Sequence, residues 1–291
     1  MINFLARVYN HFSDSLFTRI VPDRLHIRIL YRARMKKRLN LKHPQTFNEK
    51  LQWLKLYDRN PKYTSLVDKY EVKSYVASCI GEEYIIPTLG VWDRFEDINF
   101  DTLPNQFVLK CTHDSGGLII CKDKTSLDLA AAKKKINKCL KKNYYRHGRE
   151  WPYKNVKPQI IAEKYMEDES GYELKDYKVM CFGGEAKLIE LHMGRFGSHT
   201  QDFYDREWNK LDFLQGTPNS DNFIEKPDCL DKILELSEEF SKDLFHARID
   251  WYLVNGKIYF GEITFFDGSG FEPFTPEEWD YKLGEWIKLS K

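Results

Sequence analysis

The sequence RIDWYLVNGKIYFGEIT, at residues 248–264, predicts two short strands joined by a turn. Apolar residues alternate at period two on both sides of Asn255-Gly256, a dipeptide that tolerates the positive φ of a tight hairpin turn. Asp250 and Glu262 lie on opposite arms of this hairpin, so we expect them to face each other. Two carboxylates held on rigid strands suit a hard cation such as Mg²⁺. Alone, the same residues are equally compatible with a pair of surface acids.

The composition is that of a globular chain without a strong overall charge. The chain has 291 residues, of which 42% are hydrophobic, enough for one large domain or two smaller ones with real cores. The formal net charge is +1, so no overall field attracts nucleic acid and we expect no nucleic-acid partner. The cysteines form no CxxC pair and no metal-binding spacing, which favours a reduced, cytoplasmic chain.

Residues 1–100 are predicted to be mainly helical. Thr46 and Glu49 form a capping-box pattern at the start of one helix, and Pro61 follows its end. A second helix is predicted over 64–79 and stops before the glycine that follows.

The N-terminal region is also basic. Apolar residues recur at helical spacing in residues 1–17, and a run of basic residues follows between Arg24 and Lys42. This pattern is compatible with peripheral contact at the inner face of a membrane. A packed helix with a solvated basic face is the interpretation that we favour. No apolar segment approaches the length of a membrane span.

The rest of the chain mixes strands and helices. Strands are predicted at 106–111, 118–121 and 159–166, a hairpin at 176–191, and helices at 126–143 and 228–245. Because these elements do not alternate regularly, the expected fold class is α+β rather than a doubly wound parallel sheet.

A glycine-containing loop follows the first of these strands. Lys110 ends the apolar strand, and the loop that follows contains Ser115, Gly116 and Gly117. Glycines let backbone N–H groups approach phosphate oxygens, and a lysine adds a positive charge. The spacing is not that of a Walker A motif. By itself, the loop is equally well explained as a flexible turn in a hairpin.

Two further segments suit a nucleotide, although each also has a purely structural explanation. Lys69 and Lys73 are four residues apart on the predicted helix, so they would share a face that can reach anionic oxygens. The backbone at the end of the strand over 159–166 can pair with the edge of an adenine, with Tyr165 and Met166 flanking the ring. Asp168 or Glu169 would reach the ribose hydroxyls. A solvated helix surface and an ordinary strand end are the alternatives.

A dense group of polar and aromatic residues lies between 192 and 208. It contains His192, Arg195, His199, Tyr204 and Asp205. These side chains suit a carboxylated sugar, with Arg195 holding the carboxylate. The alternative is a polar loop beside a strand.

In this order, the segments resemble the TupA-like ATP-grasp family, named for teichuronopeptide synthesis. The resemblance is carried by PQTFNEKLQW at 44–53, VDKYEVK at 67–73, FVLKCTHDSGG at 107–117, DYK at 176–178, FYD at 203–205 and GEIT at 261–264. It implies an ATP-grasp fold, in which two α+β lobes grip ATP. The implied divisions are a helical region at 1–100, a small lobe at 101–168 with the phosphate loop, and a large lobe at 169–291 with the metal and acceptor sites.

The resemblance also implies roles for individual residues. The ATP-binding residues would be Lys69, Lys73, Lys110, His113, Ser115, Gly116, Gly117, Glu163, Lys164, Tyr165, Met166, Asp168, Glu169 and Lys178. Arg248 and Lys110 would act catalytically on the transferred phosphoryl group. Asp250 and Glu262 would bind Mg²⁺ together with Thr264, which stands where the wider superfamily usually has asparagine. A threonine hydroxyl is a weaker ligand than an amide carbonyl.

The implied activity is that of an ATP-dependent carboxylate–amine ligase that works through an acyl phosphate. The carboxylate would belong to a uronic acid of a surface polysaccharide, whether nucleotide-linked, lipid-linked or polymeric, and the amine to an amino acid or another amine. This substrate assignment is analogy, because related sites accept several substrates. The alternatives are a sugar kinase or glycosyltransferase of polysaccharide synthesis, and a non-catalytic carbohydrate-binding protein.

Overall fold

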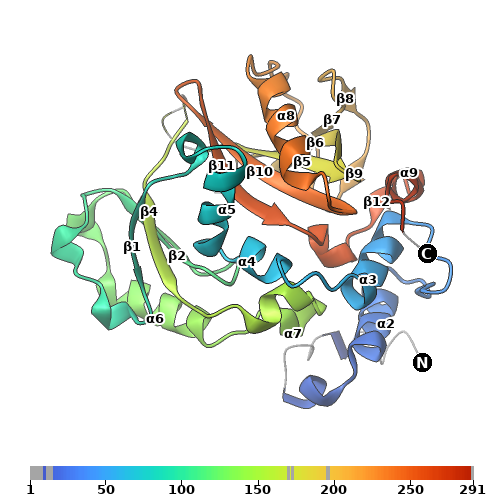
Figure 1. Ribbon diagram of the computed structural model, residues 1–291, viewed down its shortest axis with the longest axis horizontal. Helices are drawn as coiled ribbons and strands as arrows, with labels where there is room; N and C mark the ends of the chain where they lie inside the picture. Colours follow the sequence, from blue (N-terminus) through green and yellow to red (C-terminus); the bar gives the residue numbers. More distant parts are fainter. Residues whose placement is uncertain (1–8, 11–15, 169–170, 172–173, 195–196, 290–291) are drawn as a thin grey trace.

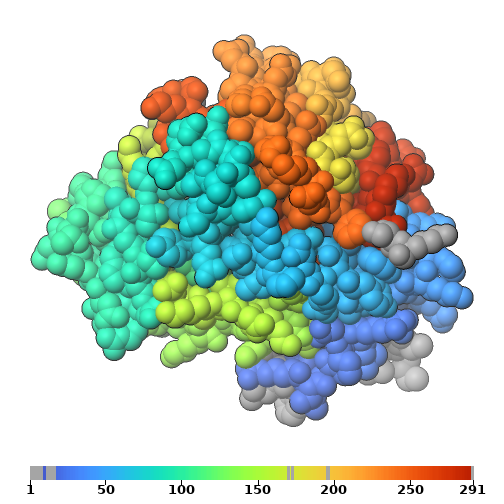
Figure 2. Space-filling view, viewed as in Figure 1, coloured from blue at the N-terminus to red at the C-terminus, as the bar shows by residue number. Residues whose placement is uncertain are grey.

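A computed structural model describes residues 9–10, 16–168, 171, 174–194 and 197–289. The described part contains a small sheet and a large sheet, and α4 (Tyr63–Val67) and α5 (Glu71–Cys79) lie between them in the view of Figure 1. In the space-filling view, the segment of α5 lies beside that of α8 (Leu230–Ser241), a helix of the large-sheet layer (Figure 2). The mixed helices and sheets confirm the expected α+β class.

The small sheet is antiparallel, with strand order β1-β4-β2-β3. Its strands are β1 (Thr88–Trp92), β2 (Phe107–Cys111), β3 (Leu118–Cys121) and β4 (Ile160–Lys164), which confirms the three strands predicted after residue 100. Along β2, Phe107 and Leu109 are buried in a cluster with Ile136 of α6 (Leu129–Leu140). Val108 and Lys110 alternate with them and face the cleft. Strand β1 comes from the region predicted to be mainly helical and pairs with β4.

The large sheet has the order β11-β10-β5-β6-β7-β8, and all of its neighbouring strands are antiparallel. Its strands are β5 (Asp176–Phe182), β6 (Glu185–Met193), β7 (Thr200–Tyr204), β8 (Lys210–Leu211), β10 (His246–Val254) and β11 (Lys257–Thr264). Both predicted hairpins, including the one at 248–264, are confirmed. A separate two-stranded sheet pairs β9 (Leu214–Gln215) with β12 (Phe274–Thr275).

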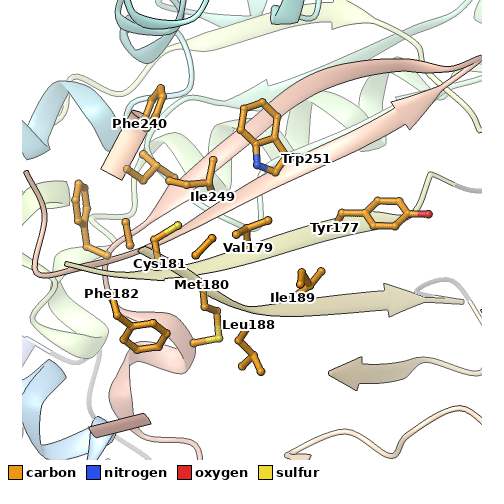
Figure 3. Packing of buried hydrophobic residues seen from close by; sticks show 14 of the residues in the cluster. Tyr177, Val179, Met180, Cys181, Phe182, Leu188, Ile189, Phe240, Ile249 and Trp251 are labelled. Carbon is orange, nitrogen blue, oxygen red and sulfur yellow. The ribbon is translucent and has the colours of Figure 1, made fainter. Parts of the chain in front are cut away.

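Helix α8 covers one face of the large sheet. Ile249 and Trp251 of β10 lie on the side of the sheet where Phe240 of α8 packs (Figure 3). The indole N–H of Trp251 donates to Ser237 Oγ of α8 at 2.8 Å, so the polar atom of this buried ring is satisfied. Because side chains alternate along a strand, the residues between these apolar ones must face the other side, toward the cleft.

The remaining helices surround this framework. They are α2 (Asp23–Arg34), α3 (Phe47–Tyr57), α7 (Tyr145–Gly148) and α9 (Glu278–Trp286), with short 3₁₀ turns at Leu16–Ile20, Glu82–Tyr84, Phe95–Asp97, Phe100–Thr102, Lys124–Ser126, Trp151–Asn155 and Asp267–Gly270. The predicted capping box is confirmed: Thr46 Oγ1 accepts the N–H of Glu49 at 3.2 Å, and the Glu49 carboxylate accepts the N–H of Thr46.

The prediction of one helix over 64–79 was wrong, because the segment is broken between α4 and α5. Asp68 adopts an extended conformation, and its Oδ1 accepts the N–H groups of Tyr70 and Glu71 at 2.7 and 3.0 Å. An aspartate that bonds the backbone in this way favours a helix start over a helix interior. Lys69 therefore lies in the break, where its N–H donates to Thr112 O at 3.0 Å.

Helix α2 packs by its apolar side, as the favoured interpretation expects, while the solvated or membrane-facing role of its basic side stays a prediction. Ile27 and Leu30 are buried, whereas Arg24 and Arg28 are exposed. Most of the amphipathic pattern expected at 1–17 lies outside the described residues. Among the described helices, none is both long and apolar enough to cross a membrane.

Replacing Trp251 with alanine should lower the free energy of unfolding by about 3–5 kcal/mol, because the substitution empties a fully buried site and removes the partner of Ser237. The matched control is Phe223→Ala. Phe223 is 86% exposed, so its loss should change stability by less than about 0.5 kcal/mol. Urea unfolding of both variants measures the difference, and equal small effects would contradict the packing described for β10.

Candidate functional site

The cleft between the two sheets contains three connected chambers. The apolar chamber, of about 530 Å³, lies against the end of β4 and includes Val108 and Met166 in its lining. The charged chamber, of about 430 Å³, shares Lys110 and Asp176 with it. The third, which we call the tyrosine chamber after Tyr144 and Tyr153, has a volume of about 310 Å³. It joins the charged chamber through shared residues that include Lys69, Arg248, Glu262 and Glu272.

A row of charged residues crosses the large sheet on its cleft side. Glu262 of β11 is opposite Asp250 of β10, which is opposite Lys178 of β5, which in turn is opposite Glu190 of β6. We call these four residues the charged row. All four line the charged chamber. The expectation that Asp250 and Glu262 face each other is confirmed by this register.

Cations hold the two carboxylates of the hairpin. Arg248 Nε and Nη2 donate to the two oxygens of Asp250 at 2.8 and 3.0 Å, and Lys178 forms an ion pair with the same carboxylate. Glu262 lies 3.5 Å from Lys69 Nζ. Burial alone would raise the pKa of Glu262, but the positive charges of Lys69, Lys178 and Arg248 lower it to about 2. Glu262 is therefore available as a charged oxygen donor at neutral pH. Burial raises the pKa of Asp250, against the opposing charges of Arg248 and Lys178 that hold its carboxylate.

The donor set fits a hard divalent cation in part. Asp250 and Glu262 supply carboxylate oxygens, and no group of three or more His, Cys, Asp or Glu side chains suited to a metal occurs among the described residues. Mg²⁺ commonly binds through one or two carboxylates while phosphates and waters complete its shell, so this pair suffices. Thr264 Oγ1 accepts a hydrogen bond from Arg248 Nη2 at 3.3 Å and lines the tyrosine chamber. Its role as a third ligand stays a prediction.

Lys69 and Lys73 do not act as the pair that the predicted helix suggested. Lys69 Nζ donates to the carbonyl oxygen of Asp114 at 2.8 Å and lines the charged chamber. Lys73 Nζ instead donates to Ile86 O at 2.7 Å and lies 2.5 Å from Glu163. The break at Asp68 separates the two lysines. Of this pair, Lys69 lines the charged chamber and Lys73 does not.

Glu163 connects the lysines of the small sheet. This buried carboxylate lies 2.7 Å from Lys110 Nζ through one oxygen and binds Lys73 through the other. Burial would raise the pKa of Glu163, but these two ammonium groups lower it to about 2. The triad holds Lys110 at the boundary of the apolar and charged chambers.

The glycine loop is shaped by Asp114 and by the strand before it. Asp114 Oδ1 accepts the N–H of Gly117 at 2.9 Å. A Cβ at Gly117 would lie 2.5 Å from Cys111 Sγ, so the close approach requires glycine. Ser115 and Gly117 line the charged chamber, and Gly116 lies between them in the chain. His113 is buried instead, with Nε2 3.1 Å from Lys142 O, and lines none of the three chambers.

The strand end predicted to receive adenine lines the apolar chamber. Lys164, Tyr165 and Met166 form one wall. Asp168, by contrast, is buried in an ion pair with Lys175 at 2.8 Å and lines none of the chambers. Glu169 lies outside the described residues.

The candidate substrate residues separate into two groups. His192 and His199 line the charged chamber, where His192 Nδ1 lies 2.8 Å from His199 Nε2 and His192 Nε2 contacts the Glu190 carboxylate. Tyr204 stacks on Trp208 with ring centroids 4.2 Å apart, away from the chambers.

The separation follows from strand alternation. Gln201 of β7 faces the charged chamber, so Tyr204, three residues later, points to the other face. Asp205 accepts the N–H of Asn209 at 2.8 Å within a turn and lines no chamber. Arg195 lies outside the described residues.

A model of the family described as TupA-like ATPgrasp matches residues 49–288, well over half of the chain. The chain belongs to the TupA-like ATP-grasp family. This membership confirms the expected ATP-grasp fold.

Several solved structures resemble parts of this ATP-grasp chain. D-alanine–D-alanine ligase from Bacillus anthracis, complexed with ATP, is 19% identical with a TM-score of 0.42, and the match covers 68% of this chain and 54% of that one. The corresponding ligase from Helicobacter pylori is 16% identical with a TM-score of 0.42, and the match covers 83% of this chain and 69% of that one. A RimK domain ATP-grasp protein from Sphaerobacter thermophilus is 9% identical with a TM-score of 0.44, and the match covers 79% of this chain and 70% of that one. The chain thus spans about half of the Bacillus ligase. No curated protein matches it.

Several residues of this ATP-grasp cleft were missed from the sequence. Glu190 is opposite Lys178, so period-two alternation from the predicted hairpin would have found it. Asp176 begins the quoted DYK segment and lines two chambers. Tyr144 and Glu150 carry no such signal, because they lie just before and just after the short helix α7.

Glu163→Gln should destabilise the protein by about 3–5 kcal/mol at neutral pH, because it leaves two partly buried ammonium groups without their carboxylate. Because folding lowers the pKa of Glu163 from 4.5 to about 2, its ionised carboxylate stabilises the fold fully above pH 4.5. This stabilisation is lost as the pH falls toward about 2, where the carboxylate becomes protonated. The deficit of the variant should therefore shrink over that range. Urea unfolding at a series of pH values tests this, with the exposed Glu278→Gln as control. A deficit independent of pH would refute the charge assignment.

Proposed function

We propose that the chain is an ATP-dependent carboxylate–amine ligase that joins an amino acid, or another amine, to a uronic acid of a surface polysaccharide. The observation that carries the proposal is the direct connection between the apolar chamber and a chamber lined by Lys69, Lys110 and the charged row. An apolar slot that opens into a cationic, carboxylate-bearing space suits a purine with its phosphates and a divalent cation.

In this proposal, each wall of the cleft binds a different part of ATP. The apolar chamber takes the adenine ring beside Tyr165 and Met166, and Lys110 lies where the phosphates leave that chamber. Lys69 and the loop at 112–117 face the phosphates in the charged chamber. Asp250 and Glu262 would hold Mg²⁺, which would offset negative charge on the phosphates.

The chemistry needs positioned charge rather than a nucleophilic side chain. A substrate carboxylate attacks the γ-phosphorus, the bond to the β–γ bridging oxygen breaks and ADP leaves, which gives an acyl phosphate, while Lys178 and Arg248 stabilise the charge that develops. The amine then displaces phosphate from the acyl carbon. Water must be excluded so that the acyl phosphate is not hydrolysed, and the loop at 112–117 covers the side of the charged chamber formed by Ser115 and Gly117.

The uronic acid would bind at the histidine end of the charged chamber. His192, His199 and Gln201 line this end and offer hydrogen-bonding groups to sugar hydroxyls. Their position beside Glu190 and Lys178 brings the sugar to the same charged row that serves the phosphoryl group.

Product analysis tests the proposal. The protein is incubated with ATP, Mg²⁺, single uronic acids and mixed amino acids, and ADP, phosphate and amide are measured by mass spectrometry. A ligase needs both substrates and yields an amide. Release of ADP with a phosphorylated sugar and no amide would identify a sugar kinase instead.

Asp250→Asn and Glu262→Gln should each reduce turnover by about 100-fold or more, because each removes charge from the proposed cation site. Circular dichroism and unfolding curves check that both variants fold. Asp221→Asn, at an exposed position, is the control for loss of one carboxylate and should keep full activity. Full activity in Glu262→Gln would show that the metal assignment is wrong.

A further inference from the structure

The tyrosine chamber has no role in binding ATP or the sugar in the function proposed above. It has a volume of about 310 Å³, at the lower end of small-ligand sites, and it opens into the charged chamber beside Arg248 and Glu262. A ligand in this chamber would therefore lie next to the acyl phosphate. The chamber has the size and position expected for the second substrate of a ligase.

Glu272 lies at the junction of the two chambers. A Cβ at Gly268 would lie 2.7 Å from the Glu272 carboxylate carbon, so the glycine makes room for this side chain. Gly268 also adopts a φ of 51°, which side-chain-bearing residues rarely take. The backbone of this turn is therefore shaped to admit the carboxylate at the junction.

Glu272 differs from the other carboxylates that line the tyrosine chamber. Asp114 accepts the N–H of Gly117, and Glu262 is close to Lys69. Glu150 is buried beside Ser269 and the charge of Lys55. The carboxylate of Glu272 has no hydrogen bond or ion pair within the part of the chain that the structure describes, so it is available to a ligand.

The opposite charge is present in the same chamber. Arg34 Nη2 lies 2.8 Å from His147 Nε2, and both side chains line the tyrosine chamber. The Arg34 guanidinium lies 5.2 Å from the ring centroid of Phe271, and His147 O is 3.1 Å from His26 Nε2. An arginine held in this way suits a carboxylate. The chamber therefore contains both an anionic side chain, Glu272, and a cationic one, Arg34.

We propose that the tyrosine chamber binds the amine substrate as an amino-acid zwitterion, with Arg34 and His147 facing its carboxylate and Glu272 accepting a proton from its ammonium group. This inference rests on the ligase function proposed above, and it names the chemical class and the location of the amine. The hydroxyls of Tyr144 and Tyr153 provide further polar contacts.

The proton transfer completes the reaction. Glu272 takes one proton from the ammonium group, and the freed lone pair attacks the acyl carbon of the acyl phosphate. A C–N bond forms, the C–O bond to phosphate breaks, and phosphate leaves with the bonding electron pair. The nitrogen loses its second proton to the departing phosphate, and Glu272 later releases its own proton to solvent.

The surroundings of Glu272 suit a proton acceptor. Glu272 is exposed to the chamber, yet the protein crowded around its carboxylate, together with the negative charges of Asp267 and Glu190, raises the pKa of Glu272 to about 7, against the opposing effect of Arg248 and Arg34. A carboxylate with a pKa near neutrality is a stronger base than an ordinary glutamate and is still largely unprotonated above pH 7.

Hydroxylamine separates the proton transfer from the other steps. It is largely unprotonated at neutral pH, so its attack on the acyl phosphate needs no proton acceptor. With ATP, Mg²⁺ and glucuronate or galacturonate, Glu272→Gln should lose about 100-fold in amide formation with an amino acid but keep most of its hydroxamate formation. Glu278→Gln, which is exposed on α9, should match the wild type in both. Equal losses with both amines would overturn the role of Glu272.

The pH profile gives a second measure. The wild-type rate of amide formation should level off above about pH 7, where Glu272 is unprotonated. In Glu272→Gln the rate should continue to rise with pH, because this variant must use amine that is already unprotonated. Profiles of the same shape in both proteins would contradict the proposal.

Arg34→Gln tests the carboxylate end. The wild type should use the best amino acid more efficiently than the corresponding decarboxylated amine, and Arg34→Gln should reduce that preference about tenfold. Calorimetric binding of single amino acids, with Mg²⁺ and a non-hydrolysable ATP analogue, tests the chamber without turnover. If Arg34→Gln binds the amino acid more weakly than the wild type, the role of the tyrosine chamber is supported. This holds even if no uronic acid leads to release of ADP, because that second outcome would refute only the sugar assignment. No amino-acid binding to the wild type would overturn the inference.

Discussion

The cleft depends on the pairing register of four strands in the large sheet. This register aligns Glu262, Asp250, Lys178 and Glu190 in one row across the sheet. Their neighbours along each strand point to the opposite face and pack under α8, as Trp251 does. A slip of one residue would exchange the two faces, burying charges under the helix and exposing the core. The hydrophobic core and the charged chamber are thus two results of one constraint.

The small sheet obeys the same rule on the other side of the cleft. Phe107 and Leu109 are buried beneath α6, so Val108 between them and Lys110 beyond them must face the cleft. Glu163 lies opposite Val108 on the neighbouring strand and reaches Lys110 and Lys73. Burying a charge without a partner costs several kcal/mol, so this triad fixes the lysines as a unit. Each sheet uses its apolar face for stability and its polar face for the site.

Period-two patterns explain how much could be predicted from the sequence. The hairpin at 248–264, its facing carboxylates and the lysine before the glycine loop all follow from local alternation and turn chemistry. The break at Asp68 was missed because a side chain capping the backbone competes with the helical pattern that surrounds it. The tyrosine chamber was missed for a different reason. It combines Arg34, Tyr144 and Glu272, which are far apart in the chain and meet only through tertiary packing.

The pairing of charges in the cleft also bears on how a dense cluster of buried ions could serve the proposed nucleotide. Asp250 is neutralised by Arg248 and Lys178, and Glu262 by Lys69. If these carboxylates held a divalent cation, as proposed, the same three cations would become available to phosphates. The site would then exchange one set of ion pairs for another and leave no buried charge uncompensated. An apolar cleft of the same shape would bind the purine but could not make this exchange.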